Sequence, residues 1–182
     1  MHCCTANASR TLYYIWDSIL DCQDKTLRVN LLLNRASRWA EFNSYLPYQG
    51  KVELKVKQQL DTVSVRMPTW IETDGHQILC AVNGQSRAIS WQGRYVNVGA
   101  AAAGDTVSLS FPIREQTIRK RIYGEPHETM IGAVEYNELV FRGNTLVSID
   151  PPGGHCPIYQ RNQYRSPEPA WRKMTRFVAE QE

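Results

Sequence analysis

The sequence predicts a mainly β protein, an antiparallel β-sandwich preceded by one amphipathic helix. Three observations support this fold class. Apolar residues recur at helical spacing between Leu12 and Leu20, the period changes to two from Lys25 onward, and short alternating segments separated by turn signals then continue to about residue 150. A succession of short alternating strands is typical of a β-sandwich.

The composition is that of a folded protein with a core. The chain has 182 residues, of which 42% are hydrophobic and 21% charged, and these values exclude intrinsic disorder. No run approaches 18 apolar residues, which excludes a membrane-spanning segment. The net charge of +3 is too weak to indicate a nucleic-acid partner. The first ten residues lack the apolar core of a signal peptide, so we expect this chain on its own to be cytoplasmic.

The amino-terminal segment is predicted to be a helix of about 16 residues. Its apolar positions are Leu12, Ile15, Trp16, Ile19 and Leu20, with Tyr13 and Tyr14 widening the face. Thr5, Asn7 and Ser9 are candidate amino-terminal caps. A helix of this length is marginally stable alone, so it must pack on the sheet that follows or on another part of a larger protein.

Strands are expected within the alternating segments 27–33, 52–56, 63–67, 77–82, 94–98 and 106–111, and then within 131–141 and 144–149. Asn83-Gly84 predicts a tight hairpin turn. Glycines at both ends of 99–104 favour a loop there. After Pro-Pro-Gly-Gly at 151–154 we expect an irregular tail with a short helix following Pro169. The predicted organisation is thus a helical segment 1–22, a sandwich 23–150 and a tail 151–182.

The adjacent cysteines Cys3 and Cys4 are the sharpest chemical feature. They stand just before the predicted helix, where a thiolate is favoured as a nucleophile or metal ligand. The alternative is that one is a small buried hydrophobe and the other incidental. Adjacent cysteines bridge poorly, and five cysteines are an odd number, so reduced thiols are expected. Cys22 and Cys80 are predicted to be core or boundary thiols.

Other candidates have weaker patterns. His155-Cys156 could supply two metal ligands, alone or with Cys4 or His2, but their spacing is not that of a zinc finger or ribbon. His76 is expected in a turn and His127 on the surface. The carboxylates considered, all expected to be solvated surface charges, are Glu41, Glu125, Glu128 and Glu135. The aromatic residues that could form a sugar-stacking platform, or simply pack in the sandwich, are Trp39, Tyr45, Tyr48, Trp70, Trp91 and Tyr95.

The chain also resembles a known enzyme family. The runs CCTANASRTLYYIW, LRVNLLLNRASRW, SYLPYQGKVEL and VSVRMPTWI are similar to the carboxyl-terminal half of glycoside hydrolase family 127, the β-L-arabinofuranosidase-like enzymes. The stretches VNGQ, GDTVSLSFP and the tail from IDPPG to PIYQRNQYR extend the resemblance over nearly the whole chain. Its most specific part is Cys-Cys-x-x-Asn-x-x-Arg, here Cys3, Cys4, Asn7 and Arg10.

The resemblance implies a catalytic helical toroid followed by β-sandwich structure. It implies that Cys3 is the nucleophile and that Cys3 and Cys4 bind zinc, together with a glutamate and another cysteine, while a separate glutamate is the general acid/base. Only two residues precede Cys3, so we expect the helix to be the end of a toroid that this chain lacks. The expected activity is that of a retaining glycosidase on β-L-arabinofuranosides or similar plant glycans, absent from the fragment alone.

Two alternatives remain open at this stage. The chain could be a non-catalytic β-sandwich that binds carbohydrate or packs as a structural partner, which the strands, the aromatic residues and the lack of a general acid favour. A redox or metal-sensing protein that uses Cys3 and Cys4 is the weaker alternative. If the helix is the end of a toroid that this chain lacks, its apolar face is a predicted site of association.

Overall fold

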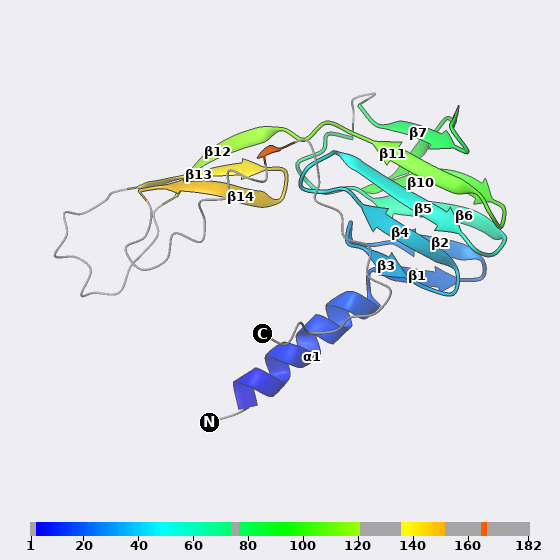
Figure 1. The fold of residues 1–182 in the computed structure, drawn as a ribbon, viewed down its shortest axis with the longest axis horizontal. Coiled ribbons are helices and arrows are strands. Elements are labelled where there is room, and N and C mark those ends of the chain that lie inside the picture. Colours follow the sequence, from blue (N-terminus) through cyan, green and yellow to red (C-terminus); the bar gives the residue numbers. More distant parts are fainter. Residues whose placement is uncertain (1–2, 74–76, 121–135, 152–164, 167–182) are drawn as a thin grey trace, which may run out of the picture.

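The computed structural model describes residues 3–73, 77–120, 136–151 and 165–166 (Figure 1). The described residues form one helix, α1 (Cys3–Asp17), and fourteen strands. The predicted fold class, a mainly antiparallel β-sandwich preceded by one helix, is confirmed.

Two sheets make the sandwich. The first contains, in spatial order, β1 (Leu20–Gln23), β2 (Thr26–Val29), β6 (Leu60–Arg66), β10 (Tyr95–Ala101) and β9 (Ser90–Gln92). The second contains β3 (Arg35–Ala36), β4 (Ala40–Ser44), β5 (Lys51–Val56), β11 (Thr106–Ser110), β7 (Leu79–Val82) and β8 (Gln85–Ser86). Neighbouring strands pair in antiparallel fashion except for β2 and β6, which are parallel.

A third sheet lies beside the sandwich (Figure 1). It is formed by β12 (Glu115–Lys120), β13 (Asn137–Arg142) and β14 (Thr145–Asp150). The Trp70 indole N–H donates a hydrogen bond to the Asn144 side chain, and the Arg142 guanidinium donates one to the Tyr48 carbonyl at 3.3 Å. These contacts join the third sheet to loops of the sandwich.

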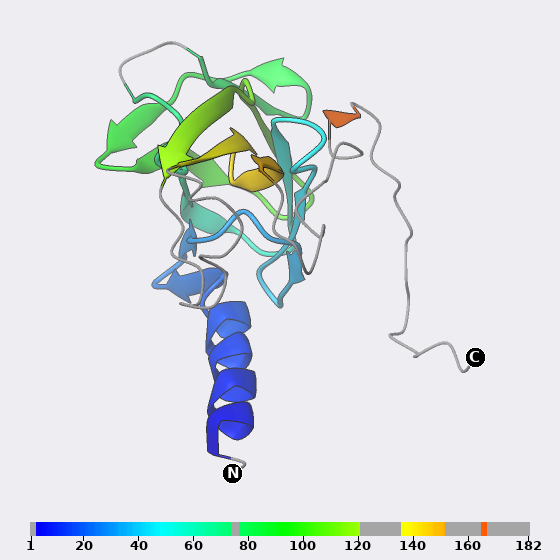
Figure 2. The ribbon, with the colours of Figure 1, turned by 90° about the vertical axis from the view of Figure 1, so that its left-hand side faces the viewer.

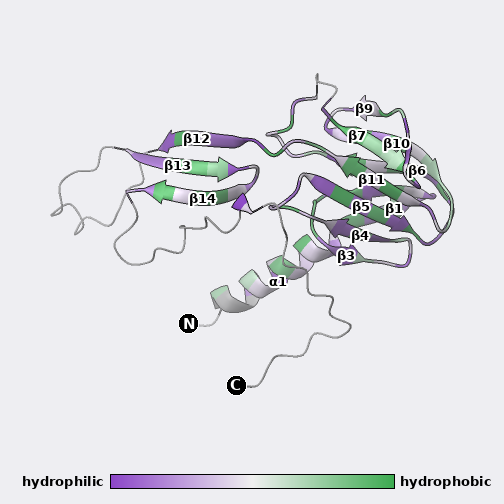
Figure 3. Cartoon of the chain, turned by 45° about the horizontal axis from the view of Figure 1, so that its top comes forward, coloured by the Kyte–Doolittle hydropathy of each residue, from purple (hydrophilic) through white to green (hydrophobic). Residues whose placement is uncertain are grey.

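The sandwich core follows from the alternation of the strands. In β5, Val52, Leu54 and Val56 are buried, whereas Glu53 between them is half-buried and Lys55 is exposed. One cluster of buried apolar side chains includes Leu27 and Val63 of the first sheet as well as residues of the second. Figure 3 shows the same pattern as green apolar residues along the sandwich strands. Period-two alternation thus produces two sheets that bury one face each.

The hairpin between β7 and β8 confirms the predicted Asn83-Gly84 turn. Val82 pairs directly with Gln85, so the loop contains two residues. Asn83 and Gly84 have φ values of 52° and 79°. Positive φ at both positions is the geometry of a type I′ turn, which Asn-Gly adopts readily.

Several details of the helix prediction are wrong. Helix α1 begins at Cys3, so Thr5, Asn7 and Ser9 lie within it and do not cap it, and the cysteine pair lies in its first turn. The helix ends at Asp17, and β1, which contains Cys22, crosses the boundary predicted at residue 22. Ile19 belongs to the core instead of the helix face.

Two strand predictions also differ from the structure. The first strand ends at Val29, short of Leu33, and β10 continues through Ala101 into the segment expected to be a loop. The register of β10 against β6 shifts around Gly99, whose φ is 84°. A bulge of this kind lets a strand pass through a glycine.

Strand β12 had no predicted counterpart. Five of its six residues are exposed, so no alternation marks it in the sequence. It is specified by its ladder with β13, whose register runs from Glu115 opposite Arg142 to Lys120 opposite Asn137.

Some predictions fall outside the described residues. They concern the short helix after Pro169 and the residues His2, His76, His127, His155, Cys156, Glu125, Glu128 and Glu135. Among the residues that are described, no helix is both long and apolar enough to cross a membrane.

Candidate functional site at helix α1

Helix α1 projects away from the sandwich, as Figures 1 and 2 show from two directions. Its carboxyl-terminal end meets the sheets, and its first turn, with Cys3 and Cys4, lies at the remote end. From Asn7 to Asp17 every residue is exposed. In the described structure, therefore, the helix is held only at its base.

Apolar side chains surround the last turns of the helix. They are Leu12, Tyr13, Tyr14, Ile15 and Trp16, each between 42% and 69% exposed. Consecutive helical residues point about 100° apart, so five in a row cover the whole circumference. We call these five residues the apolar collar. At this part of α1 apolar side chains face every direction, which favours contact with further structure around it.

The collar predicts that the isolated chain self-associates. Burying one large apolar side chain stabilises a protein by about 1.5–3 kcal/mol, and the exposed side chains of the collar would gain this stabilisation by association. Light scattering of the wild-type chain is expected to show species larger than a monomer. The double variant Leu12→Gln, Ile15→Gln should be markedly more monomeric. The matched control is Leu33→Gln, Leu79→Gln, which alters two exposed leucines of the sandwich region and should leave association unchanged. A clean wild-type monomer with a helix protected from hydrogen exchange would contradict this prediction.

The cysteine pair is placed where thiolate chemistry is favoured. Cys3 opens α1, and Cys4 is exposed in the same turn. The first turn of a helix carries partial positive charge from unpaired N–H groups, which favours anionic side chains. Within the described residues, however, no three His, Cys, Asp or Glu side chains gather to hold a metal ion.

Cys22 and Cys80 are core or boundary thiols, as predicted. Cys80 is buried in β7, and its burial raises the pKa of the thiol. Cys22 is half-buried in β1, where desolvation and the neighbouring Asp21 carboxylate raise its pKa while Arg38 lowers it. A raised pKa keeps a thiol protonated at neutral pH and makes it a poor nucleophile.

Two carboxylates of the sandwich, Glu41 and Glu53, are engaged by neighbouring side chains. Glu41 is half-buried, not fully solvated as expected, and accepts a hydrogen bond from Asn43 at 3.5 Å. The Tyr45 hydroxyl donates to Glu53, and Lys51 Nζ lies 2.9 Å from the other oxygen of this carboxylate. The Tyr45 hydrogen bond is the main cause that lowers the pKa of Glu53. Glu53 is therefore ionised at neutral pH and unsuited to protonating a leaving group.

The same hydrogen bond raises the pKa of Tyr45 to about 12. No pattern in the sequence predicted this pair. The register places Asn43 opposite Glu53, so Tyr45, two residues further along the chain, is a diagonal neighbour of Glu53.

A double-mutant cycle of Tyr45→Phe and Glu53→Gln is expected to give a coupling energy of about 1 kcal/mol at pH 7. Since the pKa of Glu53 is depressed, the coupling is present above the ordinary carboxyl pKa and is lost as pH falls through the folded value. Since the pKa of Tyr45 is raised, the coupling is complete below pH 10 and is lost as pH rises through about 12. Urea unfolding of the four proteins across this range measures it. A coupling that does not change with pH would contradict the assignment.

The candidate aromatic platform is used for packing. All six residues are half-buried, and Trp39, Trp70 and Trp91 pack against the core. The Tyr95 hydroxyl donates to Asn30 at 2.8 Å, and the Arg38 guanidinium lies 4.8 Å from the Trp39 ring centroid. These contacts favour the structural interpretation of the aromatics.

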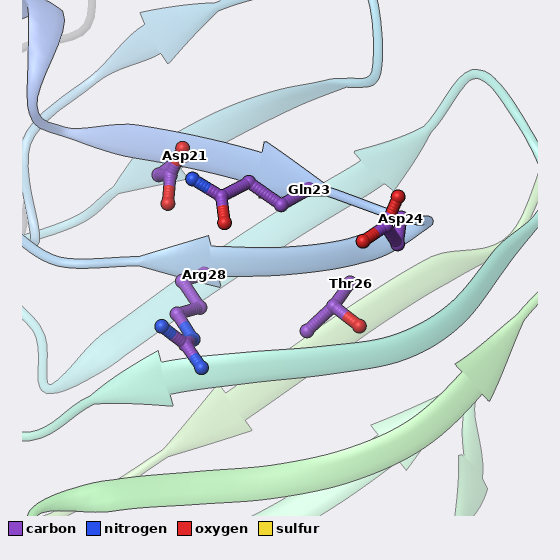
Figure 4. A pocket seen from close by; sticks show the side chains of 5 residues that line it. All are labelled: Asp21, Gln23, Asp24, Thr26 and Arg28. Atoms are coloured by element: carbon purple, nitrogen blue, oxygen red, sulfur yellow. The ribbon is translucent and has the colours of Figure 1, made fainter.

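A shallow depression of about 200 Å³ lies on the β1–β2 hairpin. Figure 4 shows its lining, which comes from β1, β2 and the turn between them and consists of Asp21, Gln23, Asp24, Thr26 and Arg28. A neighbouring depression of about 190 Å³ includes Cys22 and Trp39. Neither is lined by Cys4 or the collar, so neither is a pocket for the cysteine chemistry.

No protein-family model matches the sequence, and no curated protein matches it either. Solved structures do resemble the fold. A glycoside hydrolase matches with a TM-score of 0.58 and 17% identity, over 79% of this chain and 24% of its own. A GH127 β-arabinofuranosidase matches with a TM-score of 0.57 and 20% identity, over 79% of this chain and 25% of its own.

A GH127 β-L-arabinofuranosidase from Geobacillus stearothermophilus T6 matches with a TM-score of 0.50 and 21% identity, over 79% of this chain and 23% of its own. The chain thus spans about a quarter of the length of each of these structures. At these identities the likeness concerns the fold. In agreement with the resemblance in its sequence, the chain has the fold of a segment of glycoside hydrolase family 127 β-arabinofuranosidases.

Proposed function

We propose that this chain is part of a zinc-dependent retaining glycosidase that acts on β-L-arabinofuranosides or similar plant glycans, and that it is inactive alone. The observation that carries the proposal is the position of the cysteine pair. Cys3 and Cys4 lie in the first turn of a helix that projects from a sandwich with the GH127 fold. The apolar collar supports it, because exposed apolar side chains on every side of the last helical turns favour contact with a further domain.

In this proposal Cys3 is the nucleophile. Its thiolate attacks the anomeric carbon, the glycosidic C–O bond breaks, and the departing oxygen takes a proton from a general acid. Water then attacks the same carbon and gives a proton to the conjugate base of that acid, the C–S bond breaks, and the thiolate is regenerated with the configuration of the sugar retained. Because Glu53 is ionised at neutral pH and lies on the sandwich, it does not serve as this general acid.

Cys3 and Cys4 would also be zinc ligands. Thiolates suit zinc, and a site normally takes four ligands, so these two cysteines provide at most half of the set. Bound zinc would hold thiols in the deprotonated form at neutral pH. The described residues hold no other group able to complete the site.

Activity measurements test the proposal directly. Residues 1–182 should not hydrolyse an aryl β-L-arabinofuranoside, whereas a longer protein, expressed from the coding sequence in frame upstream of Met1 and carrying a helical domain, should. Turnover by the isolated chain that survives Cys3→Ser would overturn the proposal. So would an inactive longer protein that is folded and carries zinc.

Metal content gives a second test. After mild chelation the isolated chain is expected to retain far less than one zinc, because water or a borrowed donor must complete the tetrahedral shell. The longer protein should keep its zinc, and Cys4→Ser should remove it. Full retention by the monomeric chain would mean that it contains a complete site of its own, and the assignment of Cys3 and Cys4 would have to be abandoned.

A further inference from the structure

The base of helix α1 meets the sandwich at Arg35, the first residue of β3. The Arg35 Nη1 group donates to the Trp16 carbonyl at 2.6 Å and also to the Asp17 carbonyl, while Nη2 lies 3.3 Å from an Asp17 carboxylate oxygen. The guanidinium carbon lies 4.2 Å from the centroid of the Trp16 ring. Only 9% of the Arg35 side chain is exposed.

These contacts match what a helix end requires. The last carbonyls of a helix have no partner within it, and the end carries partial negative charge. A guanidinium supplies a rigid fork of donors and a flat face for an aromatic ring, so one arginine meets the carbonyls, the carboxylate and the indole together. A lysine ammonium lacks both the fork and the flat face.

Stability alone is a poor explanation for this arrangement. Burying a charged group is costly, and the buried Nε of Arg35 has no hydrogen-bond partner among the described residues. The terminal nitrogens of the side chain are instead directed at the last helical turn.

Asn30 provides a second point of attachment. Its side-chain amide donates to the Ser18 carbonyl at 3.0 Å, and its backbone N–H donates to the Ile19 carbonyl at 2.9 Å. The Tyr95 hydroxyl, which lies on β10, donates a hydrogen bond to the side-chain oxygen of Asn30. The connection between helix and sandwich is thus fixed on both sides of Asp17.

We infer that Arg35 is a positioning residue that sets the direction in which α1 leaves the sandwich, and therefore the place of the Cys3–Cys4 turn. The helix is about 22 Å long at 1.5 Å per residue, so a rotation of about 10° at its base displaces its far end by roughly 4 Å. In catalysis, misplacement by about 1 Å can cost a hundredfold in rate. The catalytic meaning of this positioning rests on the proposed function, whereas the positioning itself does not.

Distance measurements by pulsed electron paramagnetic resonance test the inference in the full chain at low concentration. Spin labels on bioorthogonal amino acids replace Asn7 in α1 and Asp61 in β6, both exposed, so that the native cysteines are left intact. The wild-type chain should give one narrow distance distribution, and the Arg35→Met variant should give a broad one. The Arg35→Lys variant should also give a broad distribution, because lysine keeps the charge but lacks the fork of donors. Arg38→Met, which removes a nearby exposed guanidinium, is the matched control and should stay narrow.

The outcomes are decisive in each case. The inference would be overturned by a broad distance distribution in the wild-type chain, or by a narrow one in Arg35→Met or in Arg35→Lys. It would also be overturned if Arg38→Met broadened the distribution as much as Arg35→Met does. Circular dichroism checks that the strands persist, and if Arg35→Met fails to fold, Arg35→Lys and Asn30→Ala provide the test. The measurement needs no catalysis. An inactive longer protein combined with an Arg35-dependent narrow distance would therefore reject the proposed function and keep the positioning role.

Discussion

Substituting Cys3 by serine in the longer protein is expected to lower kcat for arabinofuranoside hydrolysis by a factor of about 10³ or more. A serine hydroxyl is not ionised at neutral pH, so it cannot replace a thiolate as the nucleophile without a strong base beside it. The loss should appear in both kcat and kcat/KM, because the nucleophile acts only in the chemical step. Steady-state kinetics with an aryl glycoside measures both values.

The matched control is Cys22→Ser. Cys22 is half-buried in β1, and its raised pKa keeps it protonated, so this change should leave kcat within about twofold of wild type. The Cys4→Ser variant tests the other thiol: Cys4 is proposed as a zinc ligand only, so this change should remove zinc while leaving the Cys3 nucleophile in the chain. If Cys3→Ser keeps its activity while Cys4→Ser loses it, the roles of the two cysteines are reversed. If both remain active, neither is the nucleophile.

Replacing Phe42 by alanine is expected to lower the free energy of unfolding by about 3–5 kcal/mol. Phe42 lies in the middle of β4 with 1% of its surface exposed, between Arg35 of β3 and Leu54 of β5. Its removal leaves a cavity that the surrounding strands can fill only in part. Since the free energy of unfolding of small domains is about 5–15 kcal/mol, this one substitution removes a large part of it. Urea unfolding followed by far-ultraviolet circular dichroism measures the loss.

Leu79→Ala is the control for this prediction. Leu79 belongs to the same sheet, in β7, but is 71% exposed. Its truncation should change the free energy of unfolding by less than about 0.5 kcal/mol. Equal destabilisation by the two substitutions would mean that the face of the sheet bearing Phe42 is not the principal core.

The pattern of apolar and polar residues within short segments predicted much of the fold. The alternation in 52–56 and 63–67 identified β5 and β6 together with their buried faces, since a strand that buries one face must alternate. Asn83-Gly84 identified a hairpin turn, because few dipeptides adopt positive φ twice in succession. The apolar run from Leu12 identified α1 and the need for a partner, and the cysteine motif identified the family whose fold the chain shares.

The sequence pattern did not predict where the helix begins and ends. Thr5, Asn7 and Ser9 are good caps by type, yet the helix begins earlier, at Cys3. Ile19 continued the helical spacing, but the chain turns at Ser18 and carries Ile19 into the core. Element ends depend on where the chain must turn to pack, which apolar spacing does not encode.

Contacts between distant segments were decided by the tertiary structure. Strand β12 is almost entirely exposed and exists because β13 pairs with it, and Tyr45 finds Glu53 only after β4 and β5 align. No pattern in the sequence distinguishes Arg35, yet it donates hydrogen bonds to the end of a helix 18 residues away in the chain. Periodicity reports the face that each segment buries, because that depends on local backbone geometry. The identity of its partner depends on which buried faces meet, and that is settled only when the whole chain has folded.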